Sequence, residues 1–429
     1  MEEWRDIVGR VSDLRSAYKQ LAVHPTDRHF SIIAVRSSKT TVQLFRAVSL
    51  MFGETAAVYN FIRISRAIAH IATRILGVIN AEYFDDFTQL SQRCISASAH
   101  EALEKIITLL GWDLAMEEKK RQPFADQFVC LGVRINLAKS VEREITIDNK
   151  PGRLEEIKEL VSGVVNGSPV GFREALSLRG KIAFAESNLY GRVGAAVGHI
   201  LADWARSHRR RPATRELKEA LARVTLALEV APARVIRPMG DGPVAVMFLD
   251  GAVEDKVTIG GVLVLPGGAT EHWGCVVPEL ITESWKSRAD QVQVIGQAEV
   301  YPALVARLTW AEHLRGRRVV TFIDNESARI ALVKQYSSVL ASLRILTCCS
   351  AFDAAQGVDC WYARVPSDAN PADAPSRLDQ EELVSRGSRC VQPILPTCLD
   401  VEGVDTAEPL EYLKMEVRDR GSEDLRSQY

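Results

Sequence analysis

The sequence of 429 residues lacks any long hydrophobic run of the kind that crosses a membrane. A membrane-spanning helix needs about 18 or more consecutive apolar residues, and the most apolar stretch, residues 56–84, is interrupted by Arg63, Arg66 and Arg74. The N-terminus also lacks the basic and then apolar pattern of a signal peptide. These absences predict an intracellular protein, of the cytoplasm or nucleus, with no membrane partner.

Cysteine motifs are absent as well. None of the eight cysteines forms a Cys-x-x-Cys pair, and none stands at zinc-ligand spacing from a histidine. Cys348 and Cys349 lie in an apolar helical stretch and are expected to be buried thiols. Trp285 and Trp361 are expected as core or edge aromatics rather than as stacking platforms.

A strong net charge is the third absence. The formal net charge of −2 argues against strong nonspecific binding to nucleic acid. The distribution is uneven, because residues 1–77 hold eleven basic and six acidic side chains, whereas residues 379–429 hold twelve acidic and six basic ones. We therefore expect a basic N-terminal region and a solvated, flexible acidic tail.

The length allows two or three domains. Residues 1–150 combine helices and short strands, and one helix is expected to start at a capping box, Ser98 to Glu101, and to end at Gly111. Strand patterns then vanish, and helical ones replace them, notably at 173–206 and 214–230. The predicted domains are 1–150, a helical connector at 151–242, a mixed sheet at 243–378 and the tail at 379–429.

The region from 243 to 378 predicts an α/β fold. Three antiparallel strands are followed by alternating helices and strands, with Pro266–Gly268 as a hairpin turn. The expected strands are 244–249, 259–265, 272–277, 319–323 and 359–365, and the expected helices are 299–313, 326–335 and 339–355.

Three acids in the first 150 residues stand where two elements can bring them together. Asp13 opens a short motif, and Asp85 and Asp86 follow a run, Gly77–Phe84, that can form a strand ending in a tight turn. Acids at a hairpin tip can face an acid on a neighbouring strand and hold two magnesium ions for phosphoryl transfer. Alternatively, Asp13 is a helix N-cap and the other two form a polar turn.

Four further acids occur in the second half of the chain. Asp250 and Asp324 each end an expected strand, so both emerge at one sheet edge if these strands are parallel neighbours. Glu299 begins a helix with Pro302 in its first turn, and Asp373 lies in a rigid loop. Clustered acids raise each other's pKa and need cations, most often magnesium where phosphate is the substrate. Alternatively, each acid is a cap or turn residue.

The motifs around the first acids resemble the palm of reverse transcriptases. The matching segments are DLRSAYKQLAVHPTDRHF, MFGETAAVYNFIR, YFDD and the primer-gripping hairpin FVCLG. They are similar to the reverse transcriptase and RNase H polyprotein of DIRS-like and related long-terminal-repeat retroelements. The resemblance implies an RNA-directed DNA polymerase that uses Mg²⁺, or Mn²⁺ as a substitute, with deoxynucleoside triphosphates, an RNA template and a DNA primer.

The resemblance also implies roles for residues of the palm. Asp13 and Asp85 would be metal ligands, and Asp86 an accessory carboxylate of the turn. Tyr18 would be an aromatic gate that excludes a ribose 2′-hydroxyl, with a packed core aromatic as the alternative. The dipeptide Phe52 and Gly53 would let the backbone approach the nucleotide.

The segments LDGA, AEVYPAL, FIDNESA and NPADAPSR resemble, in order and spacing, the RNase H of the same retroelements. This implies that Asp250, Glu299, Asp324 and Asp373 surround two magnesium ions. A metal-activated water would then attack the RNA strand of an RNA–DNA hybrid, which is recognised by its shape and its 2′-hydroxyls. The resemblance runs from about residue 5 to residue 378.

Two departures from the family pattern concern the palm. Met51 stands where the family usually has proline, and only twelve residues precede Asp13, where the family has a long fingers region that binds the triphosphate. We therefore expect a polymerase with truncated fingers. Two alternatives stay open: a nuclease with an inactive palm, and a non-catalytic remnant that binds nucleic acid.

Overall fold

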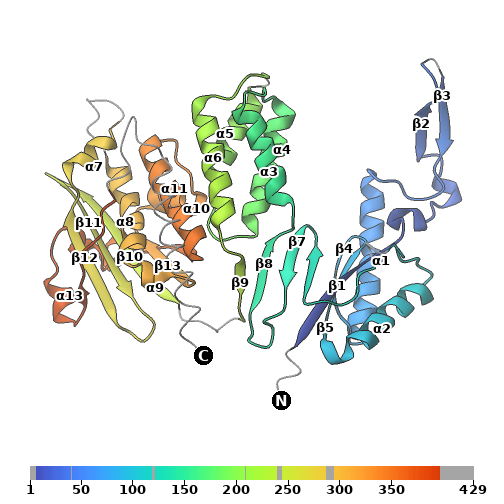
Figure 1. The fold of residues 1–429 in the computed structure, drawn as a ribbon, viewed down its shortest axis with the longest axis horizontal. Coiled ribbons are helices and arrows are strands. Elements are labelled where there is room, and N and C mark those ends of the chain that lie inside the picture. The colour runs from blue at the N-terminus through green and yellow to red at the C-terminus, as the bar shows by residue number, and fades with distance from the viewer. Residues whose placement is uncertain are drawn as a thin grey trace. The chain divides into compact units, whose positions relative to one another are not determined.

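The computed structural model of the chain describes residues 6–39, 41–117, 121–207, 209–238, 244–286 and 294–396. These residues divide into two compact units. Unit 1 holds the described residues up to 150 together with 235–238, and unit 2 holds those of 151–234 and those from 244 on. Helices, antiparallel strands and parallel strands all occur, so the expected α/β class is confirmed (Figure 1). No helix in the described residues is long and apolar enough to cross a membrane.

The first sheet of unit 1 carries the YFDD turn. Its antiparallel strands lie in the order β1, β5, β4, with bounds Ile7–Asp13, Asp86–Gln92 and Ile79–Tyr83. Helices α1 (Thr55–Arg74) and α2 (Ser96–Leu109) pack beside it through Phe61, Phe87 and Ile107, among other buried residues. The strand before the turn, expected from Gly77–Phe84, is therefore confirmed as β4.

Helix α2 begins earlier than the capping-box motif predicts. A short 3₁₀ helix, Arg93–Ile95, leads directly into Ser96, whose hydroxyl donates to the Arg93 carbonyl at 2.9 Å. Ser98 is therefore already inside the helix, and Glu101 pairs with Lys105 on its surface. The capping-box prediction is wrong, whereas Gly111 does follow the end of the helix with a positive φ of 83°.

Two further sheets complete unit 1. Strands β2 (Ile32–Arg36) and β3 (Val42–Arg46) form a separate hairpin, and short 3₁₀ helices lie at Ala17–Gln20 and Pro25–Asp27. The expected hairpin at FVCLG is present, with both turn residues at positive φ, Leu131 at 49° and Gly132 at 79°. It belongs to a sheet in the order β6, β7, β8, β9, with bounds Gln127–Cys130, Val133–Asn136, Ile145–Asn149 and Arg234–Ile236.

Unit 2 starts with a bundle of four helices around its own core. The expected helix at 214–230 is confirmed as α6, which starts after the N-cap Thr214. The expected helical stretch at 173–206 is two helices, because the chain turns at Gly191 with a φ of 70°. The four helices are α3 (Arg153–Val165), α4 (Phe172–Ser187), α5 (Ala195–Arg206) and α6 (Arg215–Val230).

The rest of unit 2 is a six-stranded mixed sheet in the order β14, β13, β10, β11, β12, β15. Strands β10, β11 and β12 are antiparallel, and β13 and β14 add in parallel on the β10 side, as expected. The bounds are Ala245–Val253 for β10, Val257–Val264 for β11, Thr270–Val276 for β12, Arg318–Ile323 for β13, Asp359–Arg364 for β14 and Arg389–Cys390 for β15.

Helices α8 and α11 lie against each other beside this sheet (Figure 1). The hydrophobic core that the sheet and these helices share is large, and it includes Trp273, Trp310 and Trp285. Cys349 is buried and Cys348 half-buried, whereas Trp361 lies on the edge strand β14 and is 71% exposed. The helices are α7 (Glu279–Ser284), α8 (Ile295–Thr309), α9 (Ala311–Leu314), α10 (Glu326–Lys334), α11 (Leu340–Gln356), α12 (Asp373–Ser376) and α13 (Glu381–Ser385).

Two expectations for this region need correction. Helix α8 begins at Ile295, so Glu299 lies in its second turn and Pro302 inside the helix rather than in the first turn. The first part of the expected flexible tail is structured, because residues up to 396 form α13 and β15, and the Tyr301 hydroxyl donates to the Pro396 carbonyl at 3.3 Å. The rest of the expected tail lies outside the described residues.

Candidate active sites

The acids of unit 2 converge from three elements. The parallel pairing of β10 with β13 ends at Leu249 opposite Ile323, so Asp250 and Asp324 emerge at the same level. Asp250 does not end its strand as expected, because β10 continues to Val253 alongside β11. Glu299 reaches the same place from α8, and ligand atoms of these three acids lie within 4.8 Å of one another. We call Asp250, Glu299 and Asp324 the acid triad.

Close backbone packing brings α8 and the loop before α12 to the triad. A Cβ on Gly251 would lie 2.2 Å from the Ala298 carbonyl oxygen of α8, and a Cβ on Gly260 would lie 2.3 Å from the backbone nitrogen of Ser376. Real Cβ atoms do not approach other atoms this closely, so both positions require glycine. Glycine in the strands therefore lets α8 and the α12 loop come close to the acids.

Neighbouring side chains hold two of the three carboxylates. The buried Ser376 hydroxyl donates to Asp250 Oδ2 at 2.5 Å, and Asn325 Nδ2 donates to Glu299 Oε1 at 3.2 Å. Asn325 is itself fixed, because its Oδ1 caps α10 by accepting from the Ala328 N–H at 3.1 Å. Two buried oxygens, Glu299 Oε2 and Asp324 Oδ1, have no hydrogen-bond partner among the described residues.

The protonation of the triad reflects its crowding. Burial, followed by the charges of Asp250 and Asp324, raises the pKa of Glu299 from 4.5 to about 8. Burial also raises the pKa of Asp250 from 3.8 to about 6, helped by the charges of Asp324 and Asp373 and opposed by the Ser376 hydrogen bond. The site therefore disfavours three negative charges unless a cation compensates them.

Asp373 lies near the triad but is not part of its closest grouping. Its charge acts on Asp250, yet its Oδ1 accepts from Arg377 Nε at 3.3 Å, and Arg377 also contacts Glu254 at 2.9 Å. The loop that carries Asp373 is tied to the sheet by Asn370, whose Nδ2 donates to the Leu249 carbonyl at 3.3 Å. Asp373 is therefore at the rim of the site, in an ion pair.

The acids of unit 1 come together through strand pairing. Asp13, the last residue of β1, lies directly opposite Asp86, the first residue of β5, and the Leu14 N–H donates to the Asp85 carbonyl at 3.2 Å. Directly opposite residues on antiparallel strands have neighbouring side chains. Phe84 in the turn has a φ of 56°, a left-handed conformation that is uncommon for a bulky residue and that recurs at functional sites.

The unit 1 acids form a looser group than the triad. In a metal site, three or more His, Cys, Asp or Glu side chains bring their ligand atoms close together. Among the described residues, the acid triad is the one such group with its ligand atoms within 4.8 Å of one another. Asp13, Asp85 and Asp86 are thus adjacent along paired strands without forming such a set. The structure brings together each pair of strands that the motifs predict, and within the part of the chain that it describes only the unit 2 acids gather into a compact ligand set.

The three residues expected around a nucleotide lie close to one another. The Tyr18 ring is buried, stacked on Phe61 at 4.6 Å between centroids and tilted against Phe52 at the same distance. Burial and then the charge of Asp85 raise the pKa of Tyr18. The Tyr18 hydroxyl therefore lies within the electrostatic field of Asp85 in the YFDD turn. Phe52 is exposed, and Gly53 has a φ of 97° with no atom within 4 Å of a Cβ position.

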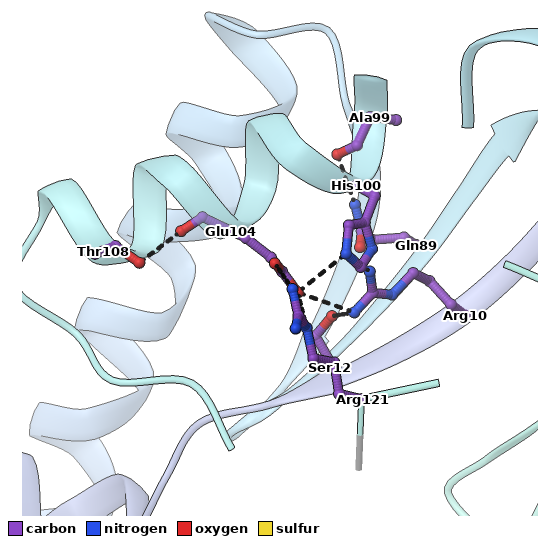
Figure 2. A network of polar contacts seen from close by, with 8 residues as sticks. All are labelled: Arg10, Ser12, Gln89, Ala99, His100, Glu104, Thr108 and Arg121. Atoms are coloured by element: carbon purple, nitrogen blue, oxygen red, sulfur yellow. Dashed lines mark hydrogen bonds and ion pairs between the residues drawn. The ribbon is translucent and has the colours of Figure 1, made fainter. Parts of the chain in front are cut away.

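A polar network around the buried Arg10 lies beside β1 in unit 1 (Figure 2). The guanidinium of Arg10, three residues before Asp13, is fully buried and donates to Ser12 Oγ at 2.8 Å. Glu104 of α2 lies 3.5 Å from Arg10 and accepts two hydrogen bonds from Arg121, at 3.0 and 2.6 Å. Burial opposes the charge of Glu104, but the two arginines together lower its pKa. This network anchors the strand that ends at Asp13.

The sequence motifs did not single out Ser376, Asn325 or Arg10. Ser376 and Asn325 stand within the NPADAPSR and FIDNESA segments, and an asparagine directly before a predicted helix is a recognisable N-cap signal. Their hydrogen bonds to the acids depend on tertiary packing, which the motifs do not describe. A basic residue in the middle of a buried strand, such as Arg10, signals a buried partner but does not identify it.

Comparison with known proteins gives structural likeness only. No protein-family model matches the sequence, and no curated protein matches it. Among solved structures, the foamy viral protease-reverse transcriptase dRH in complex with double-stranded DNA is similar, with 13% identity, a TM-score of 0.45, and coverage of 83% of this chain and 56% of that one. The foamy viral protease-reverse transcriptase in complex with an RNA/DNA hybrid is similar at 13% identity and a TM-score of 0.46, over 86% of this chain and 45% of that one. The chain thus spans about half the length of these proteins.

Proposed function

We propose that unit 2 is a ribonuclease H-type endonuclease that hydrolyses the RNA strand of an RNA–DNA hybrid. The observation that carries this proposal is the convergence of Asp250, Glu299 and Asp324, from β10, α8 and β13, within 4.8 Å. Three carboxylates of this kind, in an edge position at the ends of parallel strands, suit phosphodiester hydrolysis with divalent cations. Asp373 at the rim would complete the set of four.

The residues of the triad fit a magnesium site. Magnesium prefers carboxylate oxygens, and Glu299 Oε2 and Asp324 Oδ1 are buried oxygens whose hydrogen-bonding capacity is unused by described residues. Bound magnesium would polarise a water and neutralise charge on the phosphate. Ser376 and Asn325 would fix the orientation of Asp250 and Glu299, because each donates to one oxygen and leaves the other for a ligand.

Asp324→Asn tests this function. The substitution keeps the shape of the side chain but removes its charge, so magnesium-dependent cleavage of a labelled RNA–DNA hybrid should be lost while hybrid binding is largely retained. The matched control is Asp368→Asn, which changes an exposed acid of the same region. Unchanged cleavage in Asp324→Asn would contradict the nuclease function.

As a second function, unit 1 would be the palm of an RNA-directed DNA polymerase of a DIRS-like retroelement. Support comes from Asp13 lying opposite Asp86 and from the left-handed Phe84 in the turn that presents Asp85. Tyr18, near Asp85, would select deoxynucleotides, and Phe52 and Gly53 would line the nucleotide. The partners would be an RNA template, a DNA primer and deoxynucleoside triphosphates, used inside the cell.

Primer extension separates the two functions. The full chain should extend a DNA primer on an RNA template in magnesium, Asp85→Asn should abolish extension, and Asp324→Asn should leave it intact. Absence of extension by the unmutated chain, with hybrid cleavage present, would contradict the polymerase and leave a nuclease with an inactive palm.

A further inference from the structure

A cavity of about 350 Å³ lies in unit 2, away from the acid triad. Its wall combines the loop between α4 and α5, the edge strand β14 and the second half of α10. The chemistry of the wall is basic and aromatic, and the residues used below are Arg192, Arg234, Arg329, Tyr190 and Trp361. We call it the Trp361 cavity.

Trp361 differs from the other tryptophans of the six-stranded sheet region in its exposure. It is 71% exposed on the outermost strand of the sheet, whereas Trp273, Trp285 and Trp310 are all buried in the core of the same unit. Burying a tryptophan ring is favourable, so an exposed ring beside a cavity gains from a flat ligand that covers it. Such a ring is a typical platform for stacking a nucleobase.

The arginines give the cavity a surplus of positive charge. Arg192 donates to the Val333 carbonyl, a neutral acceptor, at 2.8 Å, and its charge also acts on the carboxyl of Glu186 in α4. Arg234 lies 3.5 Å from Asp359, and its guanidinium is 5.9 Å from the centre of the Tyr190 ring. A guanidinium has five N–H donors, so both arginines retain donors for a phosphate.

The acids near the cavity do not cancel this charge. Asp353 in the wall accepts two hydrogen bonds of 2.8 Å from the buried Arg307 and is already neutralised. Glu326 pairs with Arg329, and Asp359 faces Arg234. The three wall arginines are set against Asp359, Glu326 and Glu186, and burial raises the pKa of Glu186, which disfavours its charged form.

A second observation locates positive charge on the same side of unit 2. His199 stacks on Tyr336 at 3.8 Å, and its pKa is lowered by burial and then by Arg179, Arg192 and Lys334, against the opposing charge of Asp203. The basic side chains therefore continue from the cavity to Arg179 of α4 and to Lys334 at the end of α10. A polyanion is the ligand that suits such a surface.

The geometry points to a binding site for single-stranded nucleic acid in the Trp361 cavity, with a base stacked on Trp361 and phosphates on Arg192 and Arg234. The inference rests on the proposed function only in taking nucleic acid as the partner. Helix α10 starts beside the triad, at its cap Asn325, and its nine residues span about 14 Å to the cavity. An unpaired strand next to a bound hybrid can therefore reach it.

The test measures binding of the full chain to a fluorescein-labelled thymidine 12-mer DNA by anisotropy, in EDTA. Trp361→Ala and Arg192→Ala should each weaken binding about tenfold, and Arg192→Ala should also reduce the slope of log affinity against log salt by about 1. Trp361→Phe should bind within about threefold of the unmutated chain, because it keeps a ring. The controls Leu280→Ala and Arg386→Ala, both exposed in unit 2, should bind as the unmutated chain does.

Crosslinking locates the site directly. A 12-mer that contains 4-thiothymidine should crosslink to the peptide that holds Trp361, including in Asp324→Asn, where hybrid cleavage is lost. If the unmutated chain cleaves no hybrid but still crosslinks at this peptide, the nuclease function is refuted and the nucleic-acid binding site in the Trp361 cavity is supported. Unchanged affinity in Trp361→Ala and Arg192→Ala, with no crosslink at β14, would overturn the inference and favour another occupant, such as a peptide strand added to the edge.

Discussion

The two sets of acids differ in how the fold assembles them. In unit 1, the pairing of one strand with another, β1 with β5, places Asp13 opposite Asp86. In unit 2, a strand of the antiparallel part of the sheet, a parallel strand and a helix must all meet before the triad forms. Adjacency along paired strands therefore does not by itself gather three ligand atoms. A compact ligand set requires a third element, here α8.

The largest expected effect separates the two sets by activity. Asp250→Asn should reduce magnesium-dependent hybrid cleavage by at least about 100-fold, because it removes a carboxylate that would hold the magnesium ion. Asp86→Asn, in unit 1, should leave cleavage within about twofold. Cleavage assays of both variants on one hybrid check this, and equal losses would mean that the two sets do not act separately.

The next effect concerns stability in unit 1. Glu104→Gln should destabilise this unit by about 3 kcal/mol, because the buried Arg10 loses its nearest carboxylate. Glu101→Gln on the same helix removes only an exposed pair with Lys105 and should cost less than about 0.5 kcal/mol. Urea unfolding, monitored by hydrogen exchange of the β1 and α2 amides, measures the free energy of unfolding of both variants. A similar loss of stability in the two variants would show that the network does not anchor β1.

A smaller effect is expected at the residues that orient the triad. Ser376→Ala should weaken manganese binding about tenfold, since Asp250 loses the hydrogen bond that fixes its carboxylate. Calorimetric titration with Mn²⁺ gives the affinity independently of cleavage. Ser385→Ala, which removes an exposed hydroxyl on α13, is the control. If both variants bind manganese equally well, Ser376 does not position the acid.

The last effect is a pH dependence of stability without divalent ions. Folded Glu299 and Asp250, with pKa values of about 8 and about 6, keep protons that the unfolded chain releases near 4.5 and 3.8. The native state therefore binds more protons, and stability falls as the pH rises from about 4 to about 8. Thermal unfolding in EDTA at pH 5.5 and 8.5 should show this decline.

Glu299→Gln provides the control for this pH dependence. The variant carries no titrating group at position 299, so its unfolding temperature should fall less between the two pH values. Magnesium should reduce the decline in the unmutated chain, because it stabilises the ionised acids. An identical decline in Glu299→Gln would show that other groups cause it.

Much of the unit 2 site could be predicted because strand ends carry positional information. Asp324 follows directly on a buried strand, and Asp250 follows the last residue of the parallel pairing, so their meeting depends only on which strands are neighbours. The hydrogen bond of Ser376 to Asp250 could not be predicted in this way. It depends on the chain returning across Gly260, which is a property of the packed loop.

The failed predictions have the same physical origin. A proline is expected in the first turn of a helix because it lacks an N–H, yet Pro302 lies inside α8, where the helix packs closely against Gly251. Ser98 has the spacing of a capping box, but the 3₁₀ turn at Arg93–Ile95 starts the helix two residues earlier. In both cases, tertiary or neighbouring structure overrides a local rule.

The most direct measurement of the central claim is the position of manganese in crystals of the full chain soaked in Mn²⁺, located by anomalous scattering. We expect a peak among the carboxylates of Asp250, Glu299 and Asp324, and this peak should disappear in Glu299→Gln. Manganese found only at other acids of the chain, with no peak at the triad, would contradict the central claim.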